Sequence, residues 1–162
     1  MSAVSNQFKT KLDEESRIFS SLLQDNIQDL VNRMLTSKHS VSVSPEFSVR
    51  VTDQFDDESK SEGQFAVISF AYIGGIFKLL REQESLSNKE YPLVLDGPFS
   101  KLDPDQRQNV IDTIPQFAPQ VILFSKDDLH DVINPDLMGR VWTIESNAEK
   151  NIAKVKEGKL WK

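Results

Sequence analysis

The stretch Leu95-Asp96-Gly97-Pro98-Phe99-Ser100-Lys101-Leu102-Asp103 follows the mostly apolar residues Tyr91 to Val94. A short apolar strand that ends in an aspartate places the carboxylate at the edge of a parallel sheet, where ligands of such folds bind. One acid in that position typically holds Mg²⁺ beside the phosphates of a nucleotide. The composition of Asp96-Gly97-Pro98 is equally typical of a turn that ends a strand. The residues around this stretch are needed to distinguish a ligand site from a simple turn.

Apolar runs and helical patterns alternate around and after this stretch. Strands are predicted over Tyr91–Leu95, Val121–Phe124 and Val141–Ile144, with helices over about Pro104–Ile114 and around Asp127–Ile133. Short apolar runs that alternate with helices are typical of parallel strands covered on both faces. The sequence therefore predicts an α/β fold with a mostly parallel sheet flanked by helices.

The longest apolar run, Phe65 to Phe77, lies upstream of the quoted stretch. A helix that is apolar on nearly every side is expected in the middle of a protein. The run is followed at once by Lys78 and is shorter than the roughly 20 residues that cross a bilayer, so no membrane partner is expected. Gly74 and Gly75 lower the stability of an exposed helix, and close packing against another backbone is a plausible reason for them.

The N-terminal third of the chain combines one long helix with a small strand pair. Apolar residues recur at helical spacing from Phe8 to Leu35, in a pattern that fits a surface helix and the end of a coiled coil equally well. Alternation with period two from Val41 to Val51 predicts a small antiparallel strand pair. The acidic run Asp53 to Glu58 is expected to be a loop.

Composition limits the classes of protein that fit. The 162 residues are 38% hydrophobic, which is enough for one core, and the absence of cysteine excludes disulfides and thiolate metal sites. A net charge of −6 argues against a broad face for nucleic acid on this chain alone. With no apolar leader after Met1, a cytoplasmic location is expected. The lysine-rich residues 147–162 are expected to form a solvated helix end.

A second candidate site is Ser61-Glu62-Gly63-Gln64, directly before the apolar run. A helix N-terminus presents unpaired N–H groups and the positive end of a dipole, so a serine hydroxyl and these amides can hold a phosphate. The pattern S-x-x-Q is also that of a capping box, in which serine and glutamine only close the end of the helix.

Taken in order, these motifs resemble the C-terminal half of the head of an ABC-type ATPase. The S-x-G-Q segment, Ser61–Gln64, matches the signature motif, the strand ending in Asp96 matches Walker B, and the S-x-L-D segment, Ser100–Asp103, matches the D-loop. Three motifs in the correct order are more specific than any one of them. The layout of a long helix, a few strands and then the signature is similar to the SMC-like branch, which includes chromosome-maintenance proteins, repair ATPases of the SbcC type and DndD.

The resemblance implies a role for each of these segments. Residues 1–37 would be a helix at the end of a coiled coil, and residues 38–162 would form the C-terminal lobe of the head. Asp96 would hold the Mg²⁺ of ATP through water. The S-x-G-Q segment would contact the nucleotide of a second head in an ATP-sandwich dimer, and the S-x-L-D segment would lie at the dimer seam. The implied ATP-binding residues are Ser61, Glu62, Gly63, Gln64, Ser100 and Asp103, and the implied catalytic residues are Asp96 and Lys126.

Two residues depart from the family pattern. Gly97 stands where many members have the glutamate that orients the attacking water, and Lys126 stands where the switch histidine lies. Lysine can donate to a phosphate, but it is no acid or base near neutral pH unless its pKa is strongly lowered. Asp127 and Asp128 are further candidates for positioning water, but the pair is more typical of a solvated loop.

No phosphate-binding loop of the form G-x-x-x-x-G-K-[ST] occurs in the 162 residues. We therefore expect the chain to be inactive alone and to need the N-terminal P-loop lobe of the same protein, with ATP and Mg²⁺, for any hydrolysis. The resemblance implies work on DNA, through the full-length protein, in repair, modification or defence. Two alternatives stay open: a non-catalytic ABC-like interaction module with a decayed site, and an unrelated α/β binding domain whose motif matches are chance.

Overall fold

The structure, a computed structural model, describes residues 3–58, 61–82, 91–126, 129, 132–147 and 149–158. The chain divides into two compact units, Met1–Ser125 and Lys126–Lys162. We call them the first and the second unit and describe each by itself.

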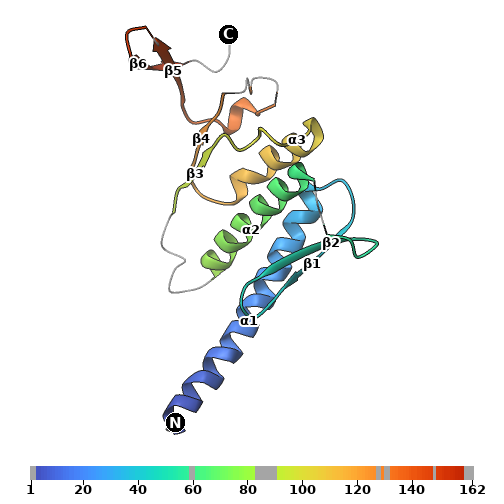
Figure 1. Ribbon diagram of the computed structural model, residues 1–162. Helices are drawn as coiled ribbons and strands as arrows, with labels where there is room; N and C mark the ends of the chain where they lie inside the picture. Colours follow the sequence, from blue (N-terminus) through green and yellow to red (C-terminus); the bar gives the residue numbers. More distant parts are fainter. Residues whose placement is uncertain are drawn as a thin grey trace. The chain divides into compact units, whose positions relative to one another are not determined.

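The first unit begins with the predicted long helix, α1, which spans Ala3–Met34. Its C-terminal half buries an apolar stripe against the rest of the unit, whereas the apolar side chains of its N-terminal half are exposed. Figure 1 shows this N-terminal half, in dark blue, extending past α2 and the first two strands. The buried stripe consists of Leu23, Ile27, Leu30, Val31 and Met34, and the exposed residues include Val4, Phe8 and Leu12.

The predicted antiparallel strand pair is confirmed and lies along α1 (Figure 1). It consists of β1, His39–Val43, and β2, Val49–Asp53. The side chain of Gln28 accepts from the amide of Val41 at 2.8 Å and donates to the carbonyl of His39 at 2.9 Å. Gln24 accepts from the amide of Val43 at 3.0 Å. The strand pair is thus attached to α1 by side-chain amides as well as by its buried valines.

Helix α2, Glu62–Glu82, forms where the apolar run predicts it. The expectation that it is buried on nearly every side is wrong for the described residues, because only Val67, Phe70, Ala71, Gly74 and Gly75 are buried. The two glycines do pack closely, but the atoms nearest to them belong mainly to side chains and not to the predicted backbone. A Cβ atom built on Gly75 would lie 2.8 Å from Cγ1 of Ile27, and one on Gly74 would lie 2.5 Å from the ring of Phe117.

Among the described residues, α2 is also the one helix that is long and apolar enough to cross a membrane, with a mean hydropathy of 1.5. The expectation that this segment is too short for a bilayer therefore does not hold for the helix as it forms, which has 21 residues. Length and composition alone do not indicate a membrane span, because a helix in the core of a soluble protein can have the same length and composition. Helix α2 packs against both α1 and α3.

The strand that ends at Asp96 is β3, Leu93–Asp96, and it pairs in parallel with β4, Val121–Phe124, as predicted. Between them run α3, Pro104–Thr113, and the 3₁₀ turn η1, Ile114–Gln116. Leu93 and Leu95 of β3 are buried, but Val94, Ile122 and Phe124 are exposed. In the described part of the chain, the face of the pair that carries these three side chains is exposed, so helices on both faces are not seen there.

The second unit contains the 3₁₀ turn η2, Pro135–Leu137, and an antiparallel hairpin of β5, Val141–Asn147, and β6, Ile152–Gly158. Two expectations are corrected here: β5 is not a parallel strand, and residues 152–158 form a strand and not a helix end. Lys154 and Lys156 alternate with apolar neighbours, and Lys156 pairs with Glu145 across the strands at 2.6 Å.

The α/β class is thus confirmed, but the predicted mostly parallel sheet is not seen in the described part of the chain. The described strands form three separate two-stranded sheets, of which only the β3–β4 pair is parallel. Most of the short helix predicted around Asp127–Ile133 lies outside the described residues. Helix α1 ends close to the predicted boundary at residue 37, although the chain's own division falls after Ser125.

Candidate functional site

The N-terminus of α2 is closed by the predicted capping box. The hydroxyl of Ser61 accepts from the amide of Gln64 at 3.1 Å, and the side chain of Gln64 accepts from the amide of Ser61 at 3.3 Å. The cap uses the hydroxyl of Ser61 only as an acceptor, so its proton stays available for another acceptor. Within the described part of the chain, the amides of Glu62 and Gly63 have no assigned acceptor. The cap and an anion can therefore use this helix end together.

The structure brings the S-x-G-Q segment against the S-x-L-D segment. A Cβ atom on Gly63 would lie 3.0 Å from the carbonyl oxygen of Lys101 and 2.6 Å from Oε1 of Gln106, so glycine allows this approach. The apolar residues of the LDGPFSKLD stretch hold the turn in place. Phe99 is buried, and its ring stacks on that of Phe70 in α2 with 6.5 Å between centroids.

An ion pair joins the same two segments. Nζ of Lys101 lies 2.8 Å from Oε2 of Glu62. The hydrogen bond from Lys101 and the attraction between the charges lower the pKa of Glu62, and the same contact raises the pKa of Lys101. Sequence reasoning missed Lys101. The available signal was the opposite charge at the variable positions of S-x-G-Q and S-x-L-D.

Asp96 is the last residue of β3 and is exposed. No hydrogen bond or ion pair joins its carboxylate to another described residue, so both oxygens are available. The described residues also hold no group of three or more His, Cys, Asp or Glu that could hold a metal ion. This donor set fits Mg²⁺ bound with a nucleotide, because Mg²⁺ usually keeps several waters and takes one or two carboxylates plus phosphate oxygens.

Gly97 has a left-handed backbone, with φ of +56°. Its amide donates to the carbonyl of Phe124 at 2.9 Å, which extends the ladder between the two parallel strands past Asp96. A residue with a Cβ atom is disfavoured in this conformation by roughly 1–2 kcal/mol. Gly97 is thus in a conformation that glycine adopts readily.

The S-x-L-D residues have local structural partners. Asp103 caps α3 by accepting from the amide of Gln106 at 2.8 Å, ahead of Pro104 at the first helical position. The hydroxyl of Ser100 donates to the carbonyl of Gly97 at 3.4 Å. Both residues are exposed. Lys126 is exposed and opens the second unit, while Asp127 and Asp128 lie outside the described residues.

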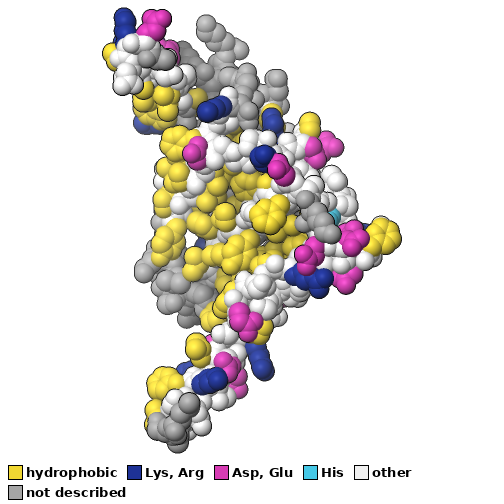
Figure 2. All heavy atoms as spheres, in the orientation of Figure 1, with side chains coloured by type: hydrophobic (Ala, Val, Ile, Leu, Met, Phe, Trp, Pro, Cys, Tyr) yellow, Lys and Arg dark blue, Asp and Glu magenta, His cyan; other side chains and the backbone are white. Residues whose placement is uncertain are grey.

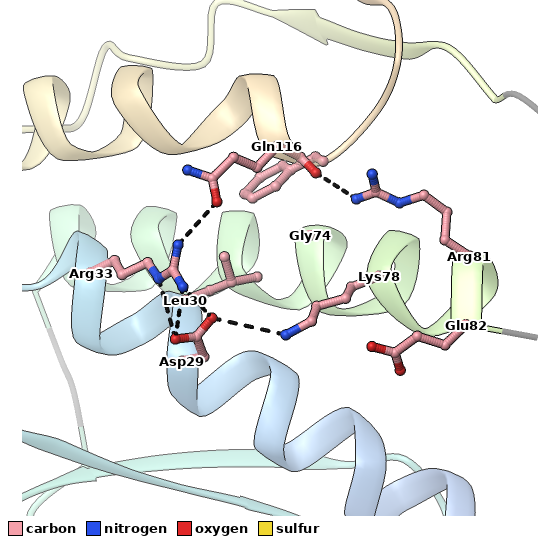
Figure 3. Close-up of a pocket in the computed structure, with 9 residues that line it drawn as sticks. Asp29, Leu30, Arg33, Gly74, Lys78, Arg81, Glu82 and Gln116 are labelled. Atoms are coloured by element: carbon pink, nitrogen blue, oxygen red, sulfur yellow. Dashed lines mark hydrogen bonds and ion pairs between the residues drawn. The ribbon is translucent and has the colours of Figure 1, made fainter.

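A cleft of about 420 Å³ lies elsewhere, between α1, the C-terminal half of α2 and η1. Figure 3 shows Arg33 and Arg81 reaching Gln116 from opposite sides and Asp29 paired with both Arg33 and Lys78. These contacts tie the three elements together. None of the predicted site residues lines the cleft, so we assign it a structural role.

No family model and no curated protein matches this chain. Solved structures of SMC ATPases do match its fold. A structure concerned with the ATP-driven dimerization and DNA-stimulated activation of SMC ATPases superimposes with a TM-score of 0.66 at 15% identity, over 92% of this chain and 90% of the other.

Two Smc head domains match in the same way. The head domain with a coiled coil and joint from Pyrococcus yayanosii has a TM-score of 0.64 at 14% identity over 86% of this chain. The head domain from Pyrococcus furiosus has an extended coiled coil and is bound to the C-terminal domain of ScpA. It has a TM-score of 0.64 at 15% identity over 86% of this chain. The match spans only 27% and 35% of those two chains. The chain therefore has the fold of a lobe of an SMC-like ABC ATPase head.

Proposed function

We propose that this chain is the C-terminal lobe of an SMC-like ATPase head, which joins a P-loop lobe and dimerises with a second head around ATP and Mg²⁺. The contact between the S-x-G-Q and S-x-L-D segments carries this proposal. Chance motif matches have no reason to pack together, yet Glu62 and Lys101 are 39 residues apart in sequence and form an ion pair. The Smc-like fold supports the same conclusion.

The bare face of β3 and β4 supports the need for a second lobe. Figure 2 shows hydrophobic side chains gathered on the face formed by α2, β3 and β4. The exposed fractions are 56% for Val94, 48% for Phe124 and 69% for Phe65. A two-stranded parallel sheet with an apolar open face is not stable alone in water, because such sheets are normally covered on both faces. Strands of a P-loop lobe would complete the sheet and cover it.

The exposed half of α1 supports the proposed coiled coil. Val4, Phe8 and Leu12 recur every four residues and are all more than half exposed, as are the side chains of the charged residues Lys11 and Glu15 beside them. An apolar stripe on an exposed helix needs a partner helix. The partner that this layout implies is the antiparallel helix of the same coiled coil.

In the assembled head, the site residues would bind the γ-phosphate and Mg²⁺ and hold them in position. The hydroxyl of Ser61 and the amides of Glu62 and Gly63 would donate to the γ-phosphate held by the opposite head, while Asp96 would hold Mg²⁺ through water. ATP with Mg²⁺ supplies the phosphoryl group when bound. Lys126 would donate to a phosphate.

A second candidate function is an ATP-gated clamp that hydrolyses little or nothing. Gly97 favours it, because glycine has no side chain to orient water where many members of the resembling family have a glutamate. Measuring phosphate release from the assembled head separates the two functions. Release that Asp96→Asn abolishes would support the ATPase, and ATP-dependent dimerisation without release would support the clamp.

The main experiment supplies the P-loop lobe by co-expression and measures dimerisation of the purified head by sedimentation with and without ATP. We expect ATP to drive dimerisation, and we expect Ser61→Arg to abolish it because a long cation would fill the phosphate position. The matched control is Ser21→Arg on the exposed face of α1. An ATP-dependent dimer that Ser61→Arg leaves unchanged would refute the proposed role of this helix end. The DNA role is tested on the same head by adding duplex DNA and measuring its effect on ATP-dependent dimerisation.

A further inference from the structure

Glu62 brings a negative charge to the helix end where the proposed function needs a phosphate. It is the acidic residue of the first turn of α2 and lies in the sequence between Ser61 and Gly63, which would supply a hydroxyl and an amide to the phosphate. An acid in the first turn stabilises a helix through the helix dipole. The same charge repels a phosphate that approaches those donors, and repulsion between like charges grows as water is excluded. A head with an uncompensated carboxylate here should bind the opposite nucleotide poorly.

Lys101 is placed to remove this repulsion. Its Nζ lies 2.8 Å from Oε2 of Glu62, and it is the only cation paired with Glu62 in the described part of the chain. The turn that carries Lys101 is held against α2 by the close approach of its carbonyl to Gly63 and by the buried Phe99. The lysine is therefore presented to Glu62 by a fixed backbone.

Building on the proposed function, we propose that Lys101 is a positioning residue that neutralises Glu62 and thereby lets an S-E-G-Q segment accept a phosphate. The lysine also couples the two segments, because the charge at the S-x-G-Q segment is compensated only while the S-x-L-D turn keeps its place.

A purely structural role predicts something different. The two side chains are 58% and 77% exposed, and ion pairs with such exposure add little to stability. If the pair served only to fasten the two segments, loss of either partner would have the same effect. Charge compensation predicts opposite effects. Loss of Lys101 leaves the charge of the Glu62 carboxylate uncompensated, whereas loss of the carboxylate removes its repulsion of the phosphate.

The test measures the ATP concentration for half-maximal dimerisation of the head assembled from this chain and its P-loop lobe. We expect Lys101→Met to raise it about tenfold, Glu62→Gln, which keeps the backbone amide, to lower it, and Lys101→Arg to keep it near the wild-type value. The double variant Glu62→Gln/Lys101→Met should return within about twofold of wild type. Lys38→Met, at an exposed lysine outside this pair, controls for loss of a positive charge.

Three outcomes decide the matter. The asymmetric pattern with rescue in the double variant supports the compensation role. Equal losses in Lys101→Met and Glu62→Gln, or a double variant as poor as Lys101→Met, overturn it while the proposed function stands. A wild-type head that shows no ATP-dependent dimerisation overturns the proposed function, and this inference falls with it. Circular dichroism of each variant chain verifies that it is folded.

Discussion

Gly74 should be one of the least tolerant positions of the chain, although it lies in a helix where alanine is normally better. A Cβ atom there would lie 2.5 Å from Cε1 of Phe117, 2.7 Å from its Cζ and 2.8 Å from Cδ1 of Leu30. All three distances are shorter than a tolerable carbon contact. Phe117 is 1% and Leu30 is 5% exposed, so both side chains are packed and have to shift to make room.

The size of the effect follows from two opposing contributions. Replacing glycine by alanine in a helix gains about 1 kcal/mol of unfolding free energy. Forcing an extra methyl group into a packed core costs about 1–3 kcal/mol, and three short contacts place Gly74→Ala at the upper end of this range. We therefore expect a net destabilisation of about 1–2 kcal/mol, which corresponds to a melting temperature lowered by roughly 2–8 °C in a chain of this size.

The assay is urea unfolding followed by circular dichroism at 222 nm, which reports on the helices of the first unit. Gly139→Ala is the control, because a Cβ atom there meets nothing within 4 Å. In the double variant Gly74→Ala/Phe117→Leu the loss should be smaller than the sum of the single losses, because the smaller side chain makes room for the methyl group. A Gly74→Ala chain as stable as wild type, or strictly additive losses, would show that the contact between α2 and Phe117, which follows η1, is looser than described.

Three other predictions concern turns and helix ends. Phe47 has φ of +63°, so Phe47→Gly should stabilise the chain by about 0.5 kcal/mol in urea unfolding, whereas Phe47→Ala, which keeps a Cβ atom, should bring no such gain. Ser61→Ala should cost about 1 kcal/mol through the lost cap, and Ser61→Asp should keep most of that stability; equal losses would contradict the capping role. Lys101→Met should raise the pKa of Glu62 toward its ordinary value in an NMR titration, and an unchanged pKa would mean that the pair does not form in solution. Because the pair lowers the pKa of Glu62 and raises that of Lys101, its contribution to stability is lost as pH falls through the lowered pKa and again as pH rises through the raised one.

Local patterns predicted several elements correctly. Helix α1 follows from a long helical periodicity, whereas the strand ending at Asp96 and the capping box at Ser61 follow from a short apolar run and a four-residue motif. The hairpin of β5 and β6 was misassigned for two reasons. A short apolar run such as Val141–Ile144 does not reveal whether its partner is parallel, and the lysines after Asn147 concealed an alternation with period two.

Other features depend on contacts that sequence patterns do not contain. The pair of Glu62 and Lys101 forms only because Phe99 anchors the turn against Phe70 on α2. The left-handed backbone at Gly97 accompanies a hydrogen bond from its amide to the carbonyl of Phe124, which is distant in sequence, at the end of the neighbouring strand. The burial predicted for α2 is missing because nothing in the described part of the chain covers that face.

The side-chain amides of Gln24 and Gln28 have a consequence for solubility. They occupy backbone groups of β1 that a strand from another molecule would otherwise bind: the amides of Val41 and Val43 and the carbonyl of His39. An open strand edge is a template for aggregation, and covering it with a helix is one way in which proteins prevent this. Helix α1 thus protects the edge of β1 from pairing with other molecules. Shortening α1 past Gln24 would expose backbone groups of β1 that can pair with a strand of another molecule.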